Sequence, residues 1–292
     1  MAGIGFVKGH GTENDFVLLP DVDAVLELTE ERVRALCDRH RGLGADGVLR
    51  LLPTTRVADL LPDVDVSVID SSTSDWFMDY RNADGSIAEM CGNGVRVFAR
   101  YLVETGLTRQ GDFAVGTRTG DRAVTVPAND PAGTVTVHMG QATVTGRSAA
   151  QLAGRTFPGV VVDVGNPHLA CLLDQDTVDV RRLDLTTAPG YDAAVFPHGV
   201  NIEFINEPAA GTLRMRVYER GVGETRSCGT GTIAVVAAAL HTSGSNTGSR
   251  TVVVPGGQVV VTVDEHDSTM TGPAVLVAAG ELSADWWADA AR

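Results

Sequence analysis

MCGNGVRVFARYL, residues 90–102, joins a cysteine and two glycines to a segment with the periodicity of an amphipathic helix. Apolar residues recur along it at helical spacing, and charged residues recur at four-residue steps on another face. The apolar positions are Val97, Phe98, Tyr101 and Leu102, and the charged positions are Arg96, Arg100 and Glu104. The pattern predicts a helix that begins directly after Cys91 and carries Arg96 on a charged face.

A second segment repeats this arrangement. SCGTGTIAVVAAAL occupies residues 227–240, and its Cys228 follows Cys91 at an offset of 137 residues. Both cysteines stand in the frame C-G-x-G. The second segment is apolar on all sides from Ile233 to Leu240, which predicts a helix enclosed by protein.

Other parts of the chain also resemble each other in the same order, which indicates an internal duplication. Two further pairs of segments keep the offset of the cysteines, and one pair has a slightly longer offset. The pairs are DYRNADG (79–85) with RVYERGV (216–222), TGDRAVTVPAND (119–130) with GGQVVVTVDEHD (256–267), and NDFVLLPD (14–21) with NPHLACLLD (166–174). Short strands that contain glycine resemble one another by chance, but repeated matches in one order favour a duplication.

The many strand-like runs and few helical ones decide the expected fold class. We expect an α+β protein of two pseudo-symmetric domains facing each other across a cleft, each a mostly antiparallel sheet or barrel wrapped around one central helix. The N-terminal half is expected over residues 1–132 with Cys91, and the pseudo-repeat over residues 133–274 with Cys228. The segment 275–292 is expected to return to the N-terminal half.

The composition of the 292-residue chain narrows the kind of protein that it can be. With 43% hydrophobic and 21% charged residues, the chain can bury a sizeable core. Its formal net charge of -14 argues against non-specific nucleic-acid binding, which needs a basic surface. The apolar run IAVVAAAL (233–240) is too short to cross a bilayer, and MAGIGFVKGH (1–10) lacks the features of a signal peptide. The sequence therefore predicts a cytoplasmic protein without a nucleic-acid or membrane partner.

Several cofactor classes lack their motifs in this sequence. Lys8 is the only lysine and lies in a strand-like segment, which argues against a pyridoxal phosphate Schiff base. GLGADG (42–47) follows a helical pattern and precedes a strand, the reverse of a dinucleotide-binding turn, and Gly42 is interpreted as a C-terminal helix glycine. Neither G-K-[ST], C-x-x-C nor H-E-x-x-H spacing occurs, so we predict no cofactor and no metal.

The position of Cys91 and Cys228 before helices has chemical consequences. The first turn of a helix exposes N–H groups and a partial positive charge, which lower the pKa of a nearby thiol and attract a carboxylate. If the two helix starts face each other, one thiolate removes an α-proton and the opposite thiol returns a proton to the other face. This arrangement predicts a racemase or an epimerase. Cys37 and Cys171 have no such setting and are predicted to lie in the core.

NADGSIAEMCGNGVR (82–96) resembles the signature of the diaminopimelate epimerase family, N-x-D-G-S followed by C-G-N-G-x-R. Further motifs of the family follow in its order over most of the chain. They are GHGTENDF (9–16), GLGADG (42–47), GNPH (165–168), VNIEF (200–204), YERGVGET (218–225) and SCGTG (227–231). The resemblance implies two pseudo-symmetric domains and a cofactor-independent enzyme that interconverts LL- and meso-diaminopimelate in lysine and peptidoglycan biosynthesis.

The resemblance also implies which groups act on the reacting end of the substrate. Cys91 and Cys228 would be the two acid–base thiols. The backbone amides around Gly92–Asn93 and Gly229–Thr230 would hold the reacting carboxylate. Asn14 would line the site near the reacting centre.

For the distal end of the substrate, the resemblance implies side chains that form charge-assisted hydrogen bonds. The groups for the distal carboxylate would be Asn82, Asn166, Asn201 and Arg220. Glu219 would bind the distal ammonium, and His168 would lie close to the site.

Two features depart from the family pattern. The connection 56–76 is longer than usual, and Gly47 stands near the point where some members carry a glutamine. The first has no functional interpretation, and the second indicates one missing binding contact.

Other functions remain open from the sequence. They are a proline or hydroxyproline racemase, a non-catalytic amino-acid-binding protein, and a redox sensor whose thiols form a disulfide. The paired cysteines argue against a related isomerase branch that lacks them, and Glu219 with Arg220 favours diaminopimelate. The expected partner is this small-molecule substrate, and a homodimer is left open as the oligomeric state.

Overall fold

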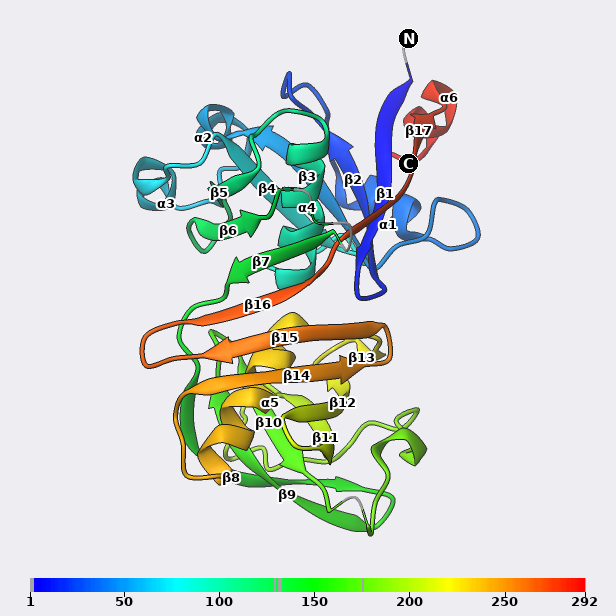
Figure 1. The fold of residues 1–292 in the computed structure, drawn as a ribbon. Helices are drawn as coiled ribbons and strands as arrows, with labels where there is room; N and C mark the ends of the chain where they lie inside the picture. The colour runs from blue at the N-terminus through cyan, green and yellow to red at the C-terminus, as the bar shows by residue number, and fades with distance from the viewer. Residues whose placement is uncertain (1–2, 129, 131–132, 175, 292) are drawn as a thin grey trace. The chain divides into compact units, whose positions relative to one another are not determined.

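The computed structural model describes residues 3–128, 130, 133–174 and 176–291 (Figure 1). The chain forms two compact units. Unit 1 comprises the residues up to Val137 and from Pro273 onward, and unit 2 comprises His138–Gly272. In each unit, strands surround one long helix.

Unit 1 combines a sheet with a smaller group of strands. Its strands are β1 (Ile4–Gly11), β2 (Asn14–Pro20), β3 (Gly47–Pro53), β4 (Trp76–Asn82), β5 (Gly111–Val115), β6 (Arg122–Val126), β7 (Thr134–His138) and β17 (Val275–Leu282). Its helices are α1 (Glu30–Cys37), η1 (Thr54–Arg56), α2 (Val57–Leu60), α3 (Val66–Ser71), α4 (Gly92–Glu104) and α6 (Ala284–Asp289). The sheet has the order β17-β1-β2-β3-β4, in which β2 and β3 are parallel and the other neighbours antiparallel. The antiparallel strands β5, β6 and β7 follow α4.

Unit 2 has a larger sheet. Its strands are β8 (Thr143–Leu152), β9 (Arg155–Asp163), β10 (Pro167–Leu172), β11 (Asn201–Ala209), β12 (Thr212–Glu219), β13 (Gly223–Thr225), β14 (Gly248–Val254), β15 (Gly257–Val263) and β16 (Ser268–Pro273). Its helices are η2 (Val180–Arg182) and α5 (Gly229–Thr242). The strand order is β8-β9-β10-β11-β12-β14-β15-β16, and β13 pairs with β12. The pairs β10–β11 and β12–β14 are parallel.

The two units repeat the same sequence of strand pairings. In unit 1, an antiparallel pair β1–β2 is followed by a parallel pair β2–β3 and an antiparallel pair β3–β4. In unit 2, β9–β10, β10–β11 and β11–β12 follow the same order. The shift of 137 residues carries Gly92 at the start of α4 onto Gly229 at the start of α5. The predicted α+β fold class is confirmed, with parallel pairs among the antiparallel strands.

The long helices lie inside their units. α4 contacts β1, β2, β3, β4, β6 and β17, and α5 contacts strands β8 to β12, β14 and β15. Every residue of α5 from Ile233 to Leu240 is buried, as its apolar composition predicted. Across the described residues, no helix has both the length and the apolar character needed to span a membrane.

Arg96 departs from its predicted place on a charged face of α4. Its side chain is fully buried, because strands enclose the helix on this side as well. A buried guanidinium needs hydrogen-bond acceptors. Arg96 donates to Asn93 Oδ1 at 2.5 Å, to Pro273 O at 3.1 Å and to Thr12 Oγ1 at 3.2 Å. The prediction of a charged outer face is therefore wrong at this residue.

Gly42 is not the C-terminal glycine of a helix, because α1 ends at Cys37. The chain after the helix turns back over its end. A Cβ at Gly42 would lie 2.0 Å from the carbonyl oxygen of Ala35, so the close approach of two backbone segments requires glycine here. GLGADG then leads into β3, in the predicted order of helix, loop and strand.

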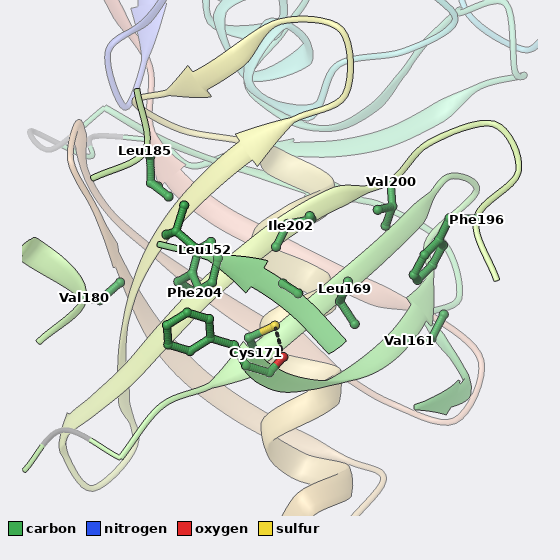
Figure 2. Close-up of a cluster of buried hydrophobic side chains, with 12 residues drawn as sticks. Leu152, Val161, Leu169, Cys171, Val180, Leu185, Phe196, Val200, Ile202 and Phe204 are labelled. Carbon is green, nitrogen blue, oxygen red and sulfur yellow. Dashed lines mark hydrogen bonds between the residues drawn. The ribbon is translucent and has the colours of Figure 1, made fainter. Parts of the chain in front are cut away.

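A cluster of aromatic and aliphatic side chains from β8, β9, β10, β11 and the adjoining connections forms part of the core of unit 2 (Figure 2). The rings of Phe157 and Phe204 meet edge to face with their centroids 5.3 Å apart. Cys171 lies among them, with Sγ 3.4 Å from the carbonyl oxygen of Phe157. Cys37 lies in a comparable cluster of unit 1. Burial raises the pKa of both thiols to about 12, and their predicted core positions are confirmed.

The long connection 56–76 folds into α2 and α3, which pack on unit 1. Apolar side chains of these helices share a small cluster with Leu52 of β3 and Phe77 of β4. Arg118 Nε donates to Asp63 Oδ2 at 2.8 Å, which ties the connection to the β5–β6 loop. The connection is therefore held on unit 1 by an apolar cluster and by the hydrogen bond between Arg118 and Asp63.

We expect Phe204→Ala to lower the free energy of unfolding by about 3–5 kcal/mol, because it removes a fully buried ring and leaves a cavity. Urea unfolding followed by circular dichroism measures this change. Val25→Ala, at an exposed loop position, is the control and should change the stability by less than about 0.5 kcal/mol. A Phe204→Ala protein as stable as its parent would contradict the assignment of this core.

Candidate active site

Cys91 and Cys228 occupy the same position in the two units. Cys91 is the N-cap of α4, with extended backbone (φ -140°, ψ 115°), and its side chain does not cap the helix. Cys228 is the N-cap of α5, with φ -123° and ψ 117°, and its side chain does not cap the helix either. In each unit, a sulfur therefore lies next to the backbone amides of a helix start.

In unit 1, Asn14 links Cys91 to the first turn of α4. Its Oδ1 accepts hydrogen bonds from Cys91 Sγ at 3.6 Å and from Asn93 Nδ2 at 3.2 Å. Its Nδ2 donates to Asp46 Oδ2 at 2.8 Å. An ionised carboxylate only accepts hydrogen bonds. Asp46 therefore fixes the amide of Asn14 with its oxygen toward the cysteine.

Two cations hold the acidic residues behind Asn14. Arg39 Nη2 lies 2.9 Å from both Asp15 Oδ1 and Asp46 Oδ1. Lys8, the single lysine, forms an ion pair with Asp15. Burial opposes ionisation of Asp15, but hydrogen bonds from Arg39 and Lys8 outweigh it and lower the pKa of this carboxyl. These ion pairs hold Asp46, and through it they hold the orientation of Asn14. We call the residues around each cysteine a half-site.

Arg96 places a buried positive charge near Cys91. Burial lowers the pKa of Arg96 to about 10, while the charge of the Cys91 sulfur opposes this shift. The guanidinium therefore remains protonated at neutral pH. A neighbouring cation stabilises the anionic form of a thiol, so the charge of Arg96 acts in this direction on Cys91.

The pKa of Cys228 changes in the opposite direction from the prediction. Burial raises it well above the ordinary value, and the negative charges of Glu219 and Glu203 raise it further. Hydrogen bonds from Thr230 and from the backbone of Gly231 offset only part of this effect. The predicted lowering by the helix start is wrong for Cys228, because desolvation and two carboxylates outweigh the helix amides.

Glu219 lies beside Cys228 at the end of β12. Burial raises the pKa of Glu219, although hydrogen bonds with Thr225 and Cys228 oppose this change. Thr225 Oγ1 is the donor to Glu219 Oε1. The carboxyl group is thus held near the sulfur by a neighbouring strand, β13.

A chain of hydrogen-bonding groups leads from the interior of unit 2 to Cys228. Fully buried Glu203 and His168 meet at 2.7 Å through Oε1 and Nδ1. His168 Nε2 lies 3.0 Å from Asn166 Oδ1, and Asn166 Nδ2 donates to Thr230 Oγ1 at 3.5 Å. Thr230 Oγ1 in turn lies 3.6 Å from Cys228 Sγ.

The residues expected to bind the distal carboxylate are divided between the units. Asn166, Asn201 and Arg220 belong to unit 2. Asn201 Oδ1 accepts a hydrogen bond from the backbone N–H of Arg220 at 2.9 Å, so the Nδ2 of Asn201 faces away from this backbone group. Asn82 belongs to unit 1, where its Nδ2 donates to Ser86 Oγ at 3.0 Å.

Three charged residues near the two cysteines are absent from the site residues that the sequence predicts. Asp46 lies in GLGADG, before β3, and Glu203 lies in VNIEF, in β11. The single acid among the apolar residues of VNIEF is a signal that can identify Glu203 from the sequence. The sequence pattern places Arg96 on the outside of its helix. Among the described residues, no group of three or more histidine, cysteine, aspartate or glutamate side chains is arranged to hold a metal ion.

Comparison with known proteins identifies the family. The model of the family described as "Diaminopimelate epimerase" matches residues 6–145 and 160–277. The chain belongs to the diaminopimelate epimerase family. The diaminopimelate epimerase of Mycobacterium tuberculosis is 56% identical over 284 residues, which cover 97% of this chain and 98% of the relative. That of Rhodococcus opacus is 54% identical over 289 residues, with coverage of 97% and 98%.

Solved structures outside this family share the fold. A probable proline racemase from Agrobacterium radiobacter matches with a TM-score of 0.68 and 16% identity, over 97% of this chain and 93% of that chain. A hydroxyproline epimerase from Agrobacterium vitis, crystallised with trans-4-hydroxy-L-proline, matches with a TM-score of 0.66 and 15% identity over the same shares. Identities this low carry information about the fold alone.

We expect Glu219→Gln to raise the alkylation rate of Cys228 severalfold at a given pH. The negative charge of Glu219 contributes to the raised pKa of this thiol, so its removal shifts thiolate formation to lower pH. Iodoacetamide labelling across a pH series, with mass spectrometry of the peptide that contains Cys228, measures the shift. Glu224→Gln, which alters a surface pair with Arg216, is the matched control. An unchanged profile for Glu219→Gln would show that its charge does not act on Cys228.

Proposed function

We propose that the protein interconverts LL- and meso-diaminopimelate without a cofactor, with Cys91 and Cys228 as its two acid–base groups. The observation that carries the proposal is the placement of both thiols at the N-caps of equivalent helices. Membership of the diaminopimelate epimerase family supports diaminopimelate as the substrate.

The proposed reaction inverts one α-carbon. The reacting carboxylate binds to the amides around Gly92–Asn93 and Gly229–Thr230, where helix starts stabilise negative charge. The thiolate of Cys91 takes the α-proton, and the electron pair of the broken C–H bond develops into the carbanion. The thiol of Cys228 then protonates the opposite face, which leaves Cys91 as the thiol and Cys228 as the thiolate. The reverse reaction begins from that state.

The charges near the two thiols support this assignment of the starting state, which requires Cys91 to lose the proton that it donates to Asn14 Oδ1 in the structure. The guanidinium of Arg96 favours the anion at Cys91. Burial and the carboxylates of Glu219 and Glu203 favour the protonated thiol at Cys228. Removal of a proton from one face of the α-carbon requires a thiolate, and delivery of a proton to the other face requires a thiol.

The distal groups explain how the enzyme would choose one stereocentre. We propose that Arg220 binds the distal carboxylate together with three side-chain amides, and that Glu219 binds the distal ammonium. The amides are those of Asn82, Asn166 and Asn201. A fixed distal end places only one α-carbon at the thiols, and leaves the other unchanged.

The reduced state of both thiols is a condition of this chemistry. The cytoplasm keeps thiols reduced, so we propose that the enzyme acts there. Among the described residues, the four cysteines form no disulfide.

We expect Cys91→Ala and Cys228→Ala each to lower turnover of LL-diaminopimelate by at least about 100-fold, because each removes one of two acid–base groups. Racemisation by circular dichroism and α-proton exchange in deuterated water, without added cofactor, measure the loss. Cys37→Ala, which alters a core thiol, is the control for removal of a cysteine.

L-Proline, assayed beside LL-diaminopimelate, separates the proposal from its main alternative. Turnover of proline without turnover of diaminopimelate would favour a proline racemase. Full racemisation by either cysteine variant would reject the two-base scheme.

We further propose that the enzyme forms a homodimer through β17. This strand ends the order of the unit 1 sheet, and its side chains are mostly exposed. Val275 is 40% exposed and Val277 is 60% exposed. Residues 275–280 of this edge strand carry no charge, and such a stretch can pair with the same strand of a second copy.

We expect Val277→Lys to shift the protein from dimer to monomer, because a charged side chain on an edge strand opposes pairing. Sedimentation velocity at several concentrations measures the change. Val25→Lys introduces the same charge at another exposed position and should leave the dimer intact. A monomeric parent protein would reject this mode of assembly.

A further inference from the structure

Two neighbouring buried positions carry apolar side chains in unit 1 and polar side chains in unit 2. Strand pairing sets Phe16 of β2 opposite Gly47 of β3, and His168 of β10 opposite Asn201 of β11. Leu49 lies two residues after Gly47 in β3, and Glu203 lies two residues after Asn201 in β11. Unit 1 therefore has a phenylalanine and a leucine where unit 2 has a histidine and a glutamate.

The contacts of two glycines support this equivalence. Gly94 and Gly231, related by the offset of 137 residues, lie in the first turns of α4 and α5. A Cβ at Gly94 would lie 3.1 Å from Leu49 Cδ2, and a Cβ at Gly231 would lie 2.9 Å from Glu203 Oε1. Leu49 and Glu203 thus lie against the same turn, directly beneath the helix start that carries the cysteine.

All four side chains are fully buried. Burial of a histidine and a glutamate costs free energy that an apolar pair avoids. Unit 1 achieves the same strand pairing and the same central helix with Phe16 and Leu49. The pair His168–Glu203 is therefore not needed for the fold, which indicates a functional reason for it.

The contacts of His168 define what the pair does. Nδ1 faces a carboxylate oxygen of Glu203, and Nε2 faces the amide oxygen of Asn166. Both acceptors are satisfied when both ring nitrogens carry hydrogen and Glu203 balances the charge. Asn166 then turns its oxygen inward and directs its Nδ2 to Thr230.

Asn14, the equivalent of Asn166 in unit 1, has the opposite orientation. There Asp46 accepts from Nδ2, so Asn14 presents its oxygen to Cys91. One half-site consequently offers an amide acceptor and the other an amide donor. A donor suits the carboxylate that Asn166 is proposed to bind.

We propose that Glu203 is a positioning residue, which holds His168 doubly protonated and thereby fixes Asn166 with its N–H groups toward the substrate carboxylate. This inference rests on the proposed function for the identity of the substrate. The negative charge that Glu203 adds near Cys228 is consistent with the same role, because it helps to keep that thiol protonated.

Glu203→Gln tests the first step without any assay of activity. The amide oxygen of the glutamine still accepts from Nδ1, but the charge that balances a second proton is absent. Nitrogen-15 NMR of histidine-labelled protein, with His168 assigned by its loss in His168→Phe, should report two N–H groups in the parent and one in Glu203→Gln. A singly protonated His168 in the parent would overturn the proposal.

Kinetics with diaminopimelate test the second step. In Glu203→Gln, Nε2 of His168 carries a lone pair instead of a hydrogen. Asn166 then turns its Nδ2 toward this nitrogen and its oxygen toward the substrate carboxylate. Glu203→Gln should then raise KM by about 10-fold or more, the effect of a lost hydrogen bond to a charged group. In an Asn166→Ala background the same substitution should add little. An equal effect in both backgrounds would show that Glu203 does not act through Asn166.

Two further proteins separate this role from folding and from the proposed function. Glu207→Gln, the same change at the exposed end of β11, should leave KM unchanged. The double variant His168→Phe, Glu203→Leu copies the pair of unit 1, and should melt at or above the parent temperature while KM rises. Failure of the parent to turn over diaminopimelate would reject the proposed function, and the NMR result would still decide the role of Glu203.

Discussion

The first turn of a helix carries N–H groups that the helix itself cannot satisfy. In this protein, strands surround both α4 and α5, so few groups are close enough to accept hydrogen bonds from these donors. Each end begins with a cysteine whose side chain does not cap it. In the proposed reaction, a substrate carboxylate satisfies these donors and brings its α-carbon beside a sulfur. The chemistry proposed for the family fold thus depends on enclosed helices with uncapped starts.

The duplicated scaffold carries unequal charges. Behind Cys91, Arg96 is a buried cation, and the shift of 137 residues places the apolar Ile233 at its counterpart in α5. Beneath the start of α5, Glu203 is a buried acid, and its counterpart in unit 1 is Leu49. Backbone symmetry supplies two similar helix starts, and these substitutions give them opposite electrostatic surroundings. A two-base enzyme needs both properties, since its thiols must be equivalent in position and different in protonation.

The sequence predicted the fold class and the start of each central helix, because periodicity and repeated motifs are local signals. It failed at Arg96, since a charged residue in an amphipathic pattern is normally assigned to solvent. It also failed at the pKa of Cys228. The helix start is visible in the sequence, but burial and the approach of Glu219 and Glu203 come from strands that are distant along the chain.

By itself, the sequence determined the internal repeat, the two C-G-x-G helix starts and the α+β class, since each depends on residues close together in the chain. Only the tertiary structure decided which polar groups meet. The orientation of Asn14 by Asp46 and the contact of His168 with Glu203 depend on the register of paired strands. Hydrogen bonds and charges act over a few ångströms, so a shift of one residue in that register would turn these side chains to the other face of the sheet.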